Sequence, residues 1–177
     1  MRLKRMKNLA INIKTAKNAK DFSAGKEIIL EYVEWLGIDL SFQDFEKEIN
    51  NLQEIYSEPN GGLILASINN KIVGVAGIRR FENKDCELKR MYVKKDYRNS
   101  GIGRLMLEYA IKLAKKLNYD RIKLDTHDSM KIAIKLYLDY GFKEISSYRY
   151  NPNESTRYFE LKLKSRYLPP ANVWRSG

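Results

Sequence analysis

Cysteine and histidine are nearly absent from this chain of 177 residues, which holds one of each, Cys86 and His127. A single cysteine excludes an intrachain disulfide, and a lone histidine without a neighbouring cysteine disfavours a metal site. No segment approaches the ~20 apolar residues that a membrane span needs, and the basic start, residues 1–7, is not followed by the apolar stretch of a signal peptide. We therefore expect a cytoplasmic protein with no metal and no membrane partner.

Positive charge is abundant, with a formal net charge of +11 and a pI near 9.6. A basic surface suits nucleic acid, an acidic membrane or an anionic cofactor. The lysines and arginines are spread along the whole chain, and no nucleic-acid-binding motif accompanies them, so a solvated cationic surface is favoured and a nucleic-acid partner is not. A homodimer stays an open alternative.

The segment from Cys86 to Leu117 contains a hydrophobic strand, a glycine-containing loop and an amphipathic helix. The apolar residues of the helix, from Ile102 onward, recur at the spacing of one helical face. Glycine at 101 and 103 lets the backbone approach a ligand, and N–H groups of the first helical turn favour phosphate oxygens, which predicts an anion site. No Lys-Ser or Lys-Thr pair follows the second glycine, and no G-x-G-x-x-G pattern is present, so a P-loop and a Rossmann site are disfavoured.

The pattern Arg98-x-x-Gly101-x-Gly103, after a strand ending Met91-Tyr92-Val93, resembles the pyrophosphate-binding segment of the GCN5-related N-acetyltransferase (GNAT) family. Residues 133–142 resemble the A-x-x-L-Y-x-x-x-G-F element of the same family. The resemblance covers residues 25–163. It departs from the family at Met130, where many members carry an asparagine, so an apolar contact replaces a polar one to the pantetheine arm.

The resemblance implies a mixed α/β fold, the GNAT acyl-CoA N-acyltransferase fold, whose central mixed sheet has a splayed parallel strand pair flanked by helices. The gap is expected between the strands that end at Val93 and Asp125. It also implies acetyl-CoA as co-substrate. The expected cofactor-binding residues come from the strand end, the loop and the following helices: Met91, Tyr92, Val93, Arg98, Asn99, Ser100, Gly101, Ile102, Gly103, Arg104, Met130, Ala133 and Tyr137.

Two side chains are the candidate catalytic residues. Tyr137 lies where the family carries its general acid, although an ordinary core tyrosine would fit the same helical face. Glu87 lies at the spacing of the general base in the histone-acetylating branch, acting directly or through a water; an exposed strand glutamate or a pair with Lys89 fits equally well. The strand is expected to be bulged, so alternation does not fix the face that Glu87 takes. The N–H of Met91 is the candidate oxyanion donor.

The rest of the chain gives local signals. We predict a strand near residues 9–13, a helix ending before Gly37, a helix over 42–56 capped by Ser41 and Asp44, and a hairpin, 63–68 and 71–79, turning at Asn69-Asn70. A strand over 121–125, a helix over 129–140 and strands near 142–146 and 156–163 follow. Residues 1–163 form one expected domain, and residues 164–177 an expected flexible tail.

These observations predict an acetyl-CoA-dependent N-acetyltransferase, an acyltransferase that acts on a primary amine of a small molecule or peptide by direct attack in a ternary complex. The alternative is a basic module that binds coenzyme A or nucleic acid without turnover. Acceptor choice is expected in Tyr148, Tyr150, Asn151 and the early helices, with Asp125, Asp128 and Glu87 as an acidic rim. His127 fits a loop or helix-cap role better than that of a proton carrier, and Cys86 an inert core thiol.

Overall fold

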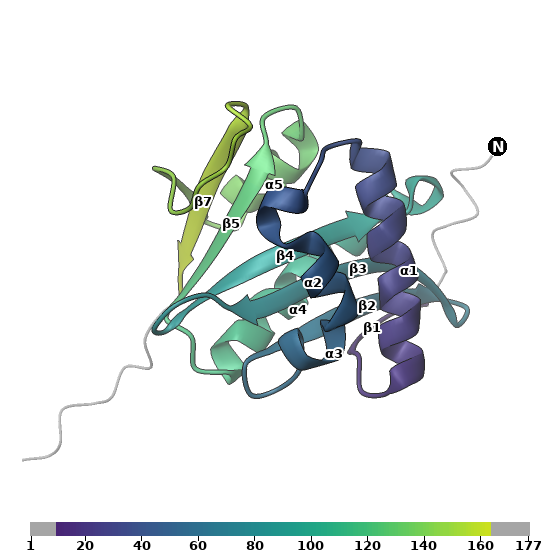
Figure 1. The fold of residues 1–177 in the computed structure, drawn as a ribbon. Helices are drawn as coiled ribbons and strands as arrows, with labels where there is room; N and C mark the ends of the chain where they lie inside the picture. Colours follow the sequence, from purple (N-terminus) through teal and green to yellow (C-terminus); the bar gives the residue numbers. More distant parts are fainter. Residues whose placement is uncertain (1–9, 164–177) are drawn as a thin grey trace, which may run out of the picture.

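The computed structural model describes residues 10–163, apart from the side chain of residue 42. Within that range seven strands form one mixed sheet in the order β1-β2-β3-β4-β5-β7-β6 (Figure 1). The strands are β1 (Ile11–Thr15), β2 (Gly61–Ile68), β3 (Lys71–Arg80), β4 (Asp85–Val93), β5 (Arg121–His127), β6 (Lys143–Ile145) and β7 (Thr156–Lys162). The expected mixed α/β class is confirmed. The tail expected at residues 164–177 lies outside the described residues.

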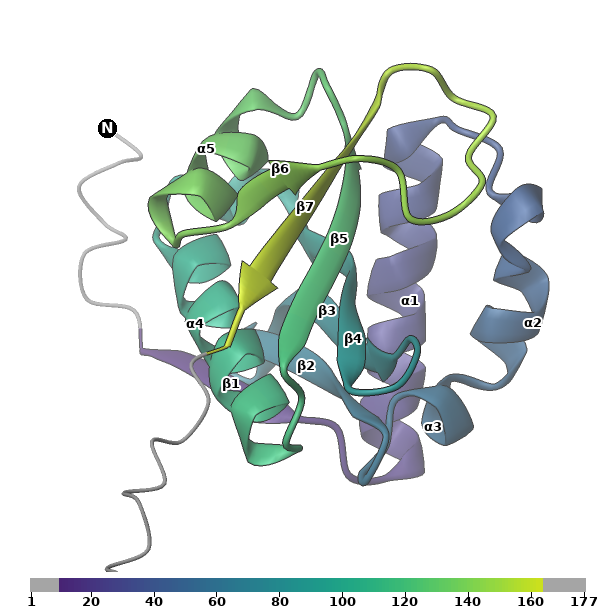
Figure 2. The ribbon, with the colours of Figure 1, turned by 90° about the vertical axis from the view of Figure 1, so that its left-hand side faces the viewer.

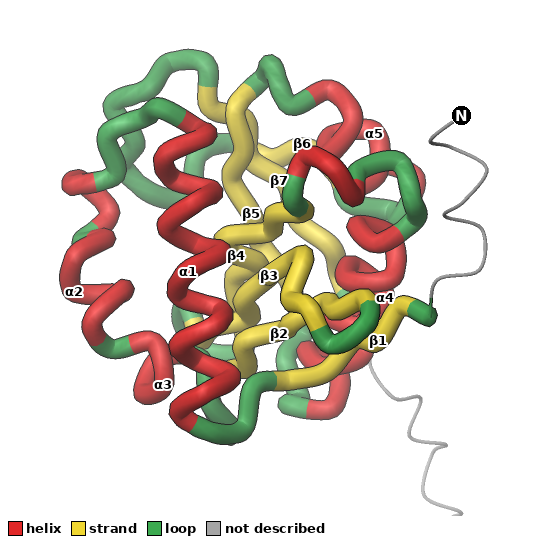
Figure 3. Tube along the Cα trace, turned by 90° about the vertical axis from the view of Figure 1, so that its right-hand side faces the viewer, coloured by secondary structure: helices red, strands yellow, loops and turns green. Residues whose placement is uncertain are grey.

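Helices cover both faces of the sheet. Figure 2 shows α1 (Ala19–Leu36), α2 (Phe45–Asn50) and α3 (Leu52–Ile55) on one face and α4 (Ile102–Lys116) and α5 (Lys131–Asp139) on the other; Figure 3 shows the same separation from the opposite side. Each face has its own hydrophobic core, because successive strand side chains point to opposite faces: Ile64 of β2 packs on the α4 side and Leu65 on the α1 side. Among the described helices, none has both the length and the apolar composition of a membrane span.

Several local signals in the sequence correspond to observed structure. Helix α1 begins at the cap Asn18, whose side chain accepts a hydrogen bond from the N–H of Asp21 at 3.0 Å, and it ends at Gly37 with φ 64°. The turn residues Asn69 and Asn70 have φ values of 48° and 63° and connect β2 to β3. The predicted helix end and the predicted hairpin are therefore confirmed, since asparagine tolerates this left-handed region better than most residues.

The single helix predicted over residues 42–56 is wrong. Ser41 begins a short 3₁₀ helix, η2 (Ser41–Gln43), and no side-chain cap forms there. Asp44 then adopts φ 53°, which interrupts the helical path before α2, and α3 follows Asn51 as a separate turn. The apolar residues of this segment therefore pack on the sheet from two short helices, α2 and α3, instead of from one continuous helix.

Strands β4 and β5 run parallel but pair only at their starts, where Glu87 lies opposite Lys123. Beyond that point β4 stays paired with β3 up to Val93, while β5 pairs with β7. The predicted gap between the strands ending at Val93 and Asp125 is therefore present. A second irregularity lies within β4, where the register shifts and Arg90 adopts φ 57°. This is the predicted bulge.

The bulge changes which face of the sheet each later residue of β4 takes. Before it, Cys86 and Leu88 belong to the core on the α4 side, so strict alternation would place residue 92 there as well. Tyr92 instead packs in the core on the α1 side, and Met91 and Val93 pack on the α4 side. The extra residue thus directs Met91 and Val93 toward α4 and α5.

Candidate active site

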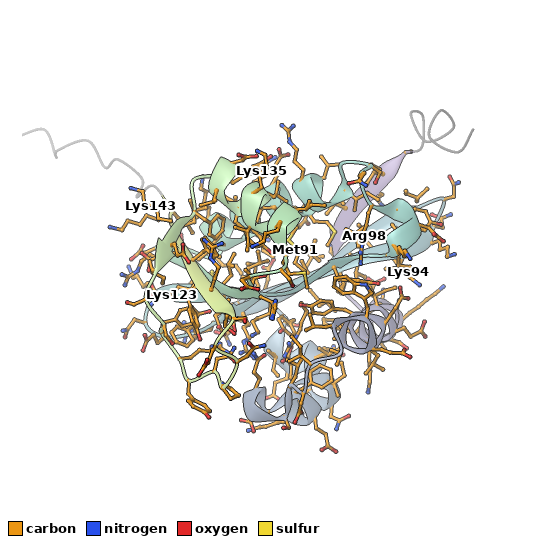
Figure 4. All side chains as sticks on the ribbon, turned by 90° about the horizontal axis from the view of Figure 1, so that it is seen from above. Met91, Lys94, Arg98, Lys123, Lys135 and Lys143 are labelled. Atoms are coloured by element: carbon orange, nitrogen blue, oxygen red, sulfur yellow. The ribbon has the colours of Figure 1, made fainter. Side chains whose placement is uncertain are left out.

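A cavity of about 710 Å³ lies where β4 and β5 separate, within the size range of small-molecule sites. Its walls come from both faces of the sheet: Ala133 and Tyr137 of α5 line one part, and Trp35 of α1 and Gln43 of η2 line another. The cavity therefore passes through the sheet at the splayed strand pair. Figure 4 shows Met91 near the centre of the molecule, with Arg98 to one side of it beside Lys94.

The loop before α4 forms the first end of the cavity. Gly101 has φ 84°, and a Cβ added there would meet no atom within 4 Å, so the space in front of the loop is open. Among the described residues no side chain caps the N-terminus of α4. The residues of this first turn line the cavity, and their N–H groups have no side-chain cap, as an anion site requires.

Arg98 fixes the loop to the end of β4. Its Nε donates a hydrogen bond to the carbonyl oxygen of Val93 at 3.0 Å. Its guanidinium group lies 4.4 Å from the centroid of the Trp35 ring and 5.3 Å from that of Tyr92. Planar stacking of this kind suits arginine and not lysine. Arg98 thus connects the loop, β4 and α1.

The predicted cofactor-binding residues all line the cavity except Ser100. The hydroxyl of Ser100 donates to the carbonyl oxygen of Tyr97 and so is turned to the loop itself. Arg104 reaches the cavity wall, but its Nε is engaged by Glu108 at 3.2 Å and by the Tyr140 hydroxyl at 2.9 Å. These placements describe geometry; the binding roles stay predictions.

Tyr137 is buried, with 6% of its surface exposed, and lines the middle of the cavity. Its ring packs against Phe142 and Phe159, and its hydroxyl lies 4.0 Å from the sulfur of Met91, its one hydrogen-bond partner among the described residues. Burial raises the pKa of the Tyr137 phenol well above its usual value. A protonated phenol without an oxygen or nitrogen partner can donate to a group that enters the cavity.

Glu87 lies elsewhere. It is fully buried and is not part of the cavity wall. Its carboxylate accepts hydrogen bonds from Arg79 at 3.0 Å, from the Tyr148 hydroxyl at 3.0 Å and from Arg149. The two alternatives predicted from the sequence, an exposed glutamate and a pair with Lys89, are not observed. Because both carboxylate oxygens of Glu87 already accept hydrogen bonds, the geometry disfavours direct proton abstraction by this side chain.

The second end of the cavity holds a lysine that sequence reasoning did not single out. The side chain of Lys89 is 3% exposed, and its Nζ lies 3.1 Å from Oε1 of Gln43 and 3.5 Å from Oδ1 of Asp125. Burial lowers the pKa of Lys89 to about 8, against the opposing charge of Asp125. The charge of Lys89 in turn lowers the pKa of Asp125, although burial alone would raise it.

The residues expected to choose the acceptor divide into two groups. Asn151 lines the cavity, and its Nδ2 lies 3.5 Å from Asp125. Tyr148 packs against Phe81 behind the wall, and Tyr150 is 78% exposed and outside it. Of these three predicted residues, Asn151 is therefore the one that lines the cavity, and Asn153 of the same loop lines it as well.

His127 and Cys86, the single histidine and the single cysteine of the chain, have surroundings that fit structural roles. His127 lines the cavity, and its Nδ1 accepts a hydrogen bond from the N–H of Ser129 at 3.1 Å, which fits the loop role favoured from the sequence. Cys86 is buried, and burial raises the pKa of its thiol, as expected for an inert core cysteine.

A buried ion pair supports the bulge in β4. Both oxygens of Glu48 accept from Arg90, at 3.1 and 2.7 Å, and the Tyr56 hydroxyl donates to the same carboxylate at 2.6 Å. Burial alone would raise the pKa of Glu48, but the hydrogen bonds and charge of Arg90 outweigh it and lower that pKa to about 2. The pair connects α2 to the residue that precedes Met91.

Comparison with known proteins agrees with this geometry. The model of the acetyltransferase (GNAT) family matches residues 29–142. An uncharacterized N-acetyltransferase of Schizosaccharomyces pombe is 31% identical over 89% of this chain and 98% of its own length, and one of Dictyostelium discoideum is 32% identical over 78% and 93%.

Solved structures show the same fold. An acetyltransferase of the GNAT family from Staphylococcus aureus superposes with a TM-score of 0.73 and 31% identity, over 88% of this chain and all of that one. An acetyltransferase from Salmonella typhimurium, solved with its cofactor acetyl-CoA, superposes with a TM-score of 0.64 at 17% identity over 92% and 99%. The predicted GNAT fold is confirmed.

Proposed function

This chain belongs to the GNAT family of acetyltransferases, and we propose that it moves the acetyl group of acetyl-CoA to a primary amine of a small molecule or peptide, by direct attack in a ternary complex. One observation carries the proposal. The cavity crosses the sheet between β4 and β5, with the glycine loop at the α4 end and polar side chains at the α1 and α2 end. Two reactants entering from opposite faces would meet at Met91 and Tyr137.

The residues at the first end suit coenzyme A. The N–H groups at the start of α4 and the open space before Gly101 would receive the diphosphate, because backbone donors and a helix N-terminus favour anions. The backbone of Met91 and Val93 in the splayed gap would receive the pantetheine arm. When bound there, the cofactor supplies an activated thioester, and Met130 and Ala133 give it an apolar wall.

The transfer itself needs little covalent help from the protein. The neutral amine nitrogen attacks the acyl carbon, a C–N bond forms, and the C–S bond breaks. The sulfur takes a proton from the Tyr137 hydroxyl, the nitrogen releases one to solvent, and the phenol is reprotonated from solvent. The N–H of Met91 is the proposed oxyanion donor, and catalysis otherwise consists of positioning.

Glu87 enters this proposal as a positioning residue. Held between Arg79 and Arg149, it fixes the loop that carries Asn151 to the end of β3. Because direct proton abstraction by Glu87 is disfavoured, its predicted role as general base requires a water that carries the proton from the amine to Glu87. We also propose that residues 1–163 act as one catalytic domain; the expected cytoplasmic location and a homodimer stay predictions.

Release of free thiol from acetyl-CoA across a panel of amines tests the function. We expect turnover with at least one amine, together with a calorimetric signal for coenzyme A binding. Tyr137→Phe should lower kcat about 10²-fold or more with coenzyme A affinity unchanged, because general acid catalysis contributes ~10²–10⁴-fold.

The matched control is Tyr119→Phe, which removes the hydroxyl of a buried tyrosine that donates to the Asn60 carbonyl oxygen and lies outside the cavity wall. It should keep full activity. Equal turnover by Tyr137→Phe and the wild type would remove the acid role, and a folded protein that neither binds coenzyme A nor releases thiol would refute the proposed function.

A further inference from the structure

Lys89 is a buried charge in the cavity wall whose hydrogen-bonding capacity is only partly used. Its Nζ has two neighbours, Gln43 and Asp125, and the distance to Asp125 is 3.5 Å, longer than a charge-assisted hydrogen bond. An ammonium group has three donors and is costly to bury without partners. The pairing observed within the protein therefore leaves capacity for an acceptor oxygen from a ligand.

The ion pairs around this end of the cavity leave Lys89 with one carboxylate partner and carry a net positive charge. Among the described residues, ion pairs join three arginines to two carboxylates in one network, Arg79, Arg90 and Arg149 with Glu48 and Glu87. Lys89 and Asp125 form a separate pair beside it. Glu48 and Glu87 hold the three arginines, so Lys89 is left with Asp125 alone. The arginine network therefore carries one more positive than negative charge next to the Lys89–Asp125 pair, and Nε of Arg149 is a buried atom without a partner among the described residues.

Lys89 and Asp125 are also placed for recognition. Both side chains line the cavity, on the face of the sheet toward α1 and α2, and Gln43 and Asn151 line it beside them. Met91, two residues beyond Lys89, lines the same cavity on the α5 side. A group bound to Lys89 thus lies next to the proposed place of acetyl transfer.

Building on the proposed function, we propose that the acceptor is a small amino-carboxylate, of which a free amino acid is the type, whose carboxylate binds Lys89 while its amino group lies toward Asp125. The reactive form of such an acceptor has a neutral amine and one negative charge, which would occupy the spare donor capacity of Lys89 and offset the net positive charge of the neighbouring arginine network. A lysine side chain within a peptide carries no carboxylate near its amine and would leave the spare donor capacity of Lys89 unused.

Matched acceptors test this inference. Free L-amino acids, each paired with its own carboxamide, are assayed for thiol release from acetyl-CoA and, by calorimetry, for binding to the protein saturated with coenzyme A. We expect at least one amino acid to bind and to react with a kcat/KM about tenfold or more above that of its carboxamide, since a hydrogen bond to a charged group is worth this much. The difference should lie mainly in KM.

A matched pair of variants assigns the effect to Lys89. Lys89→Met should abolish the preference for the carboxylate by raising KM for the amino acid about tenfold, with the KM of the carboxamide nearly unchanged. Lys123→Met is the control: this lysine pairs with Asp85 at 3.2 Å, lies outside the cavity wall and sits on the other side of Met91 from Arg98 in Figure 4. It should keep the preference.

The outcomes separate the two proposals. Carboxamides or peptide amines that bind and react as well as the amino acids would overturn the inference while the acetyltransferase function stands. Coenzyme A binding without any amino acid binding would also overturn it. A folded protein with no affinity for coenzyme A would refute the proposed function itself. If the Lys89→Met variant unfolds at the normal temperature and still prefers the carboxylate as the wild type does, Lys89 does not bind the carboxylate and the inference is overturned.

Discussion

The Glu48–Arg90 pair gives a prediction whose size can be calculated. Glu48 is 2% exposed, and its pKa is lowered from 4.5 to about 2 in the folded protein. Because the folded-state pKa is below the unfolded value, this carboxylate stabilises the fold fully above pH 4.5 and loses that contribution as the pH falls toward 2. The difference in pKa corresponds to about 3 kcal/mol, of which about 2 kcal/mol is lost by pH 3.

Glu48→Gln removes the titrating group and leaves Arg90 buried without a charge partner. At pH 6 we expect a loss of about 3–5 kcal/mol in the free energy of unfolding, the usual cost of breaking one side of a buried pair. At pH 3 the gap between wild type and variant should shrink by about 2 kcal/mol, because the wild type has by then lost most of the same contribution.

Urea unfolding at pH 6 and pH 3 measures both values, with the m-value as a check that the extent of unfolding is the same. Glu46→Gln, an exposed position on the same helix, is the control and should change stability by less than about 0.5 kcal/mol at either pH. A wild-type-to-Glu48→Gln gap that is equal at the two pH values would show that Glu48 does not titrate as calculated and would refute the reasoning.

Three further outcomes follow from the cavity wall. Gly101→Val should weaken coenzyme A binding by calorimetry at least about tenfold, because φ 84° is strained for a β-branched residue and the side chain would enter the open space before the loop; unchanged affinity would contradict the loop assignment. Arg98→Lys should also weaken coenzyme A binding, since lysine cannot both stack on Trp35 and donate to Val93. An unaltered affinity would show that these two contacts of Arg98 are not needed for binding. The ¹³Cε resonance of Lys89 should titrate with a midpoint near 8, and a midpoint near 10.5 would mean that the ammonium is solvated.

Most elements and the proposed cofactor end of the site can be predicted from the sequence because their signals are local. A glycine at 37 ends a helix, two asparagines at 69 and 70 make a tight turn, and Gly101 precedes α4 with Gly103 in its first turn. The acceptor end has no such signal. Its polar side chains come from four separate segments, at Gln43, Lys89, Asp125 and Asn151, and no spacing in the sequence connects them. The break at Asp44 has no local signal for a related reason: the packing of short helices on the sheet overrides the apolar stripe.

The bulge in β4 explains why face assignments by alternation fail at the place where the chemistry is proposed. Lys89 and Arg90 are consecutive, yet Lys89 contacts Gln43 and Arg90 contacts Glu48, both on the α2 side of the sheet. Met91 then falls on the α5 side, opposite Tyr137. In a regular strand Met91 would lie on the same face as Lys89, and its side chain would not reach Tyr137 on the α5 side. The ion pair that holds Arg90 at φ 57° therefore supports both proposed ends of the site: Lys89 faces the proposed acceptor end, and Met91 faces the proposed cofactor end.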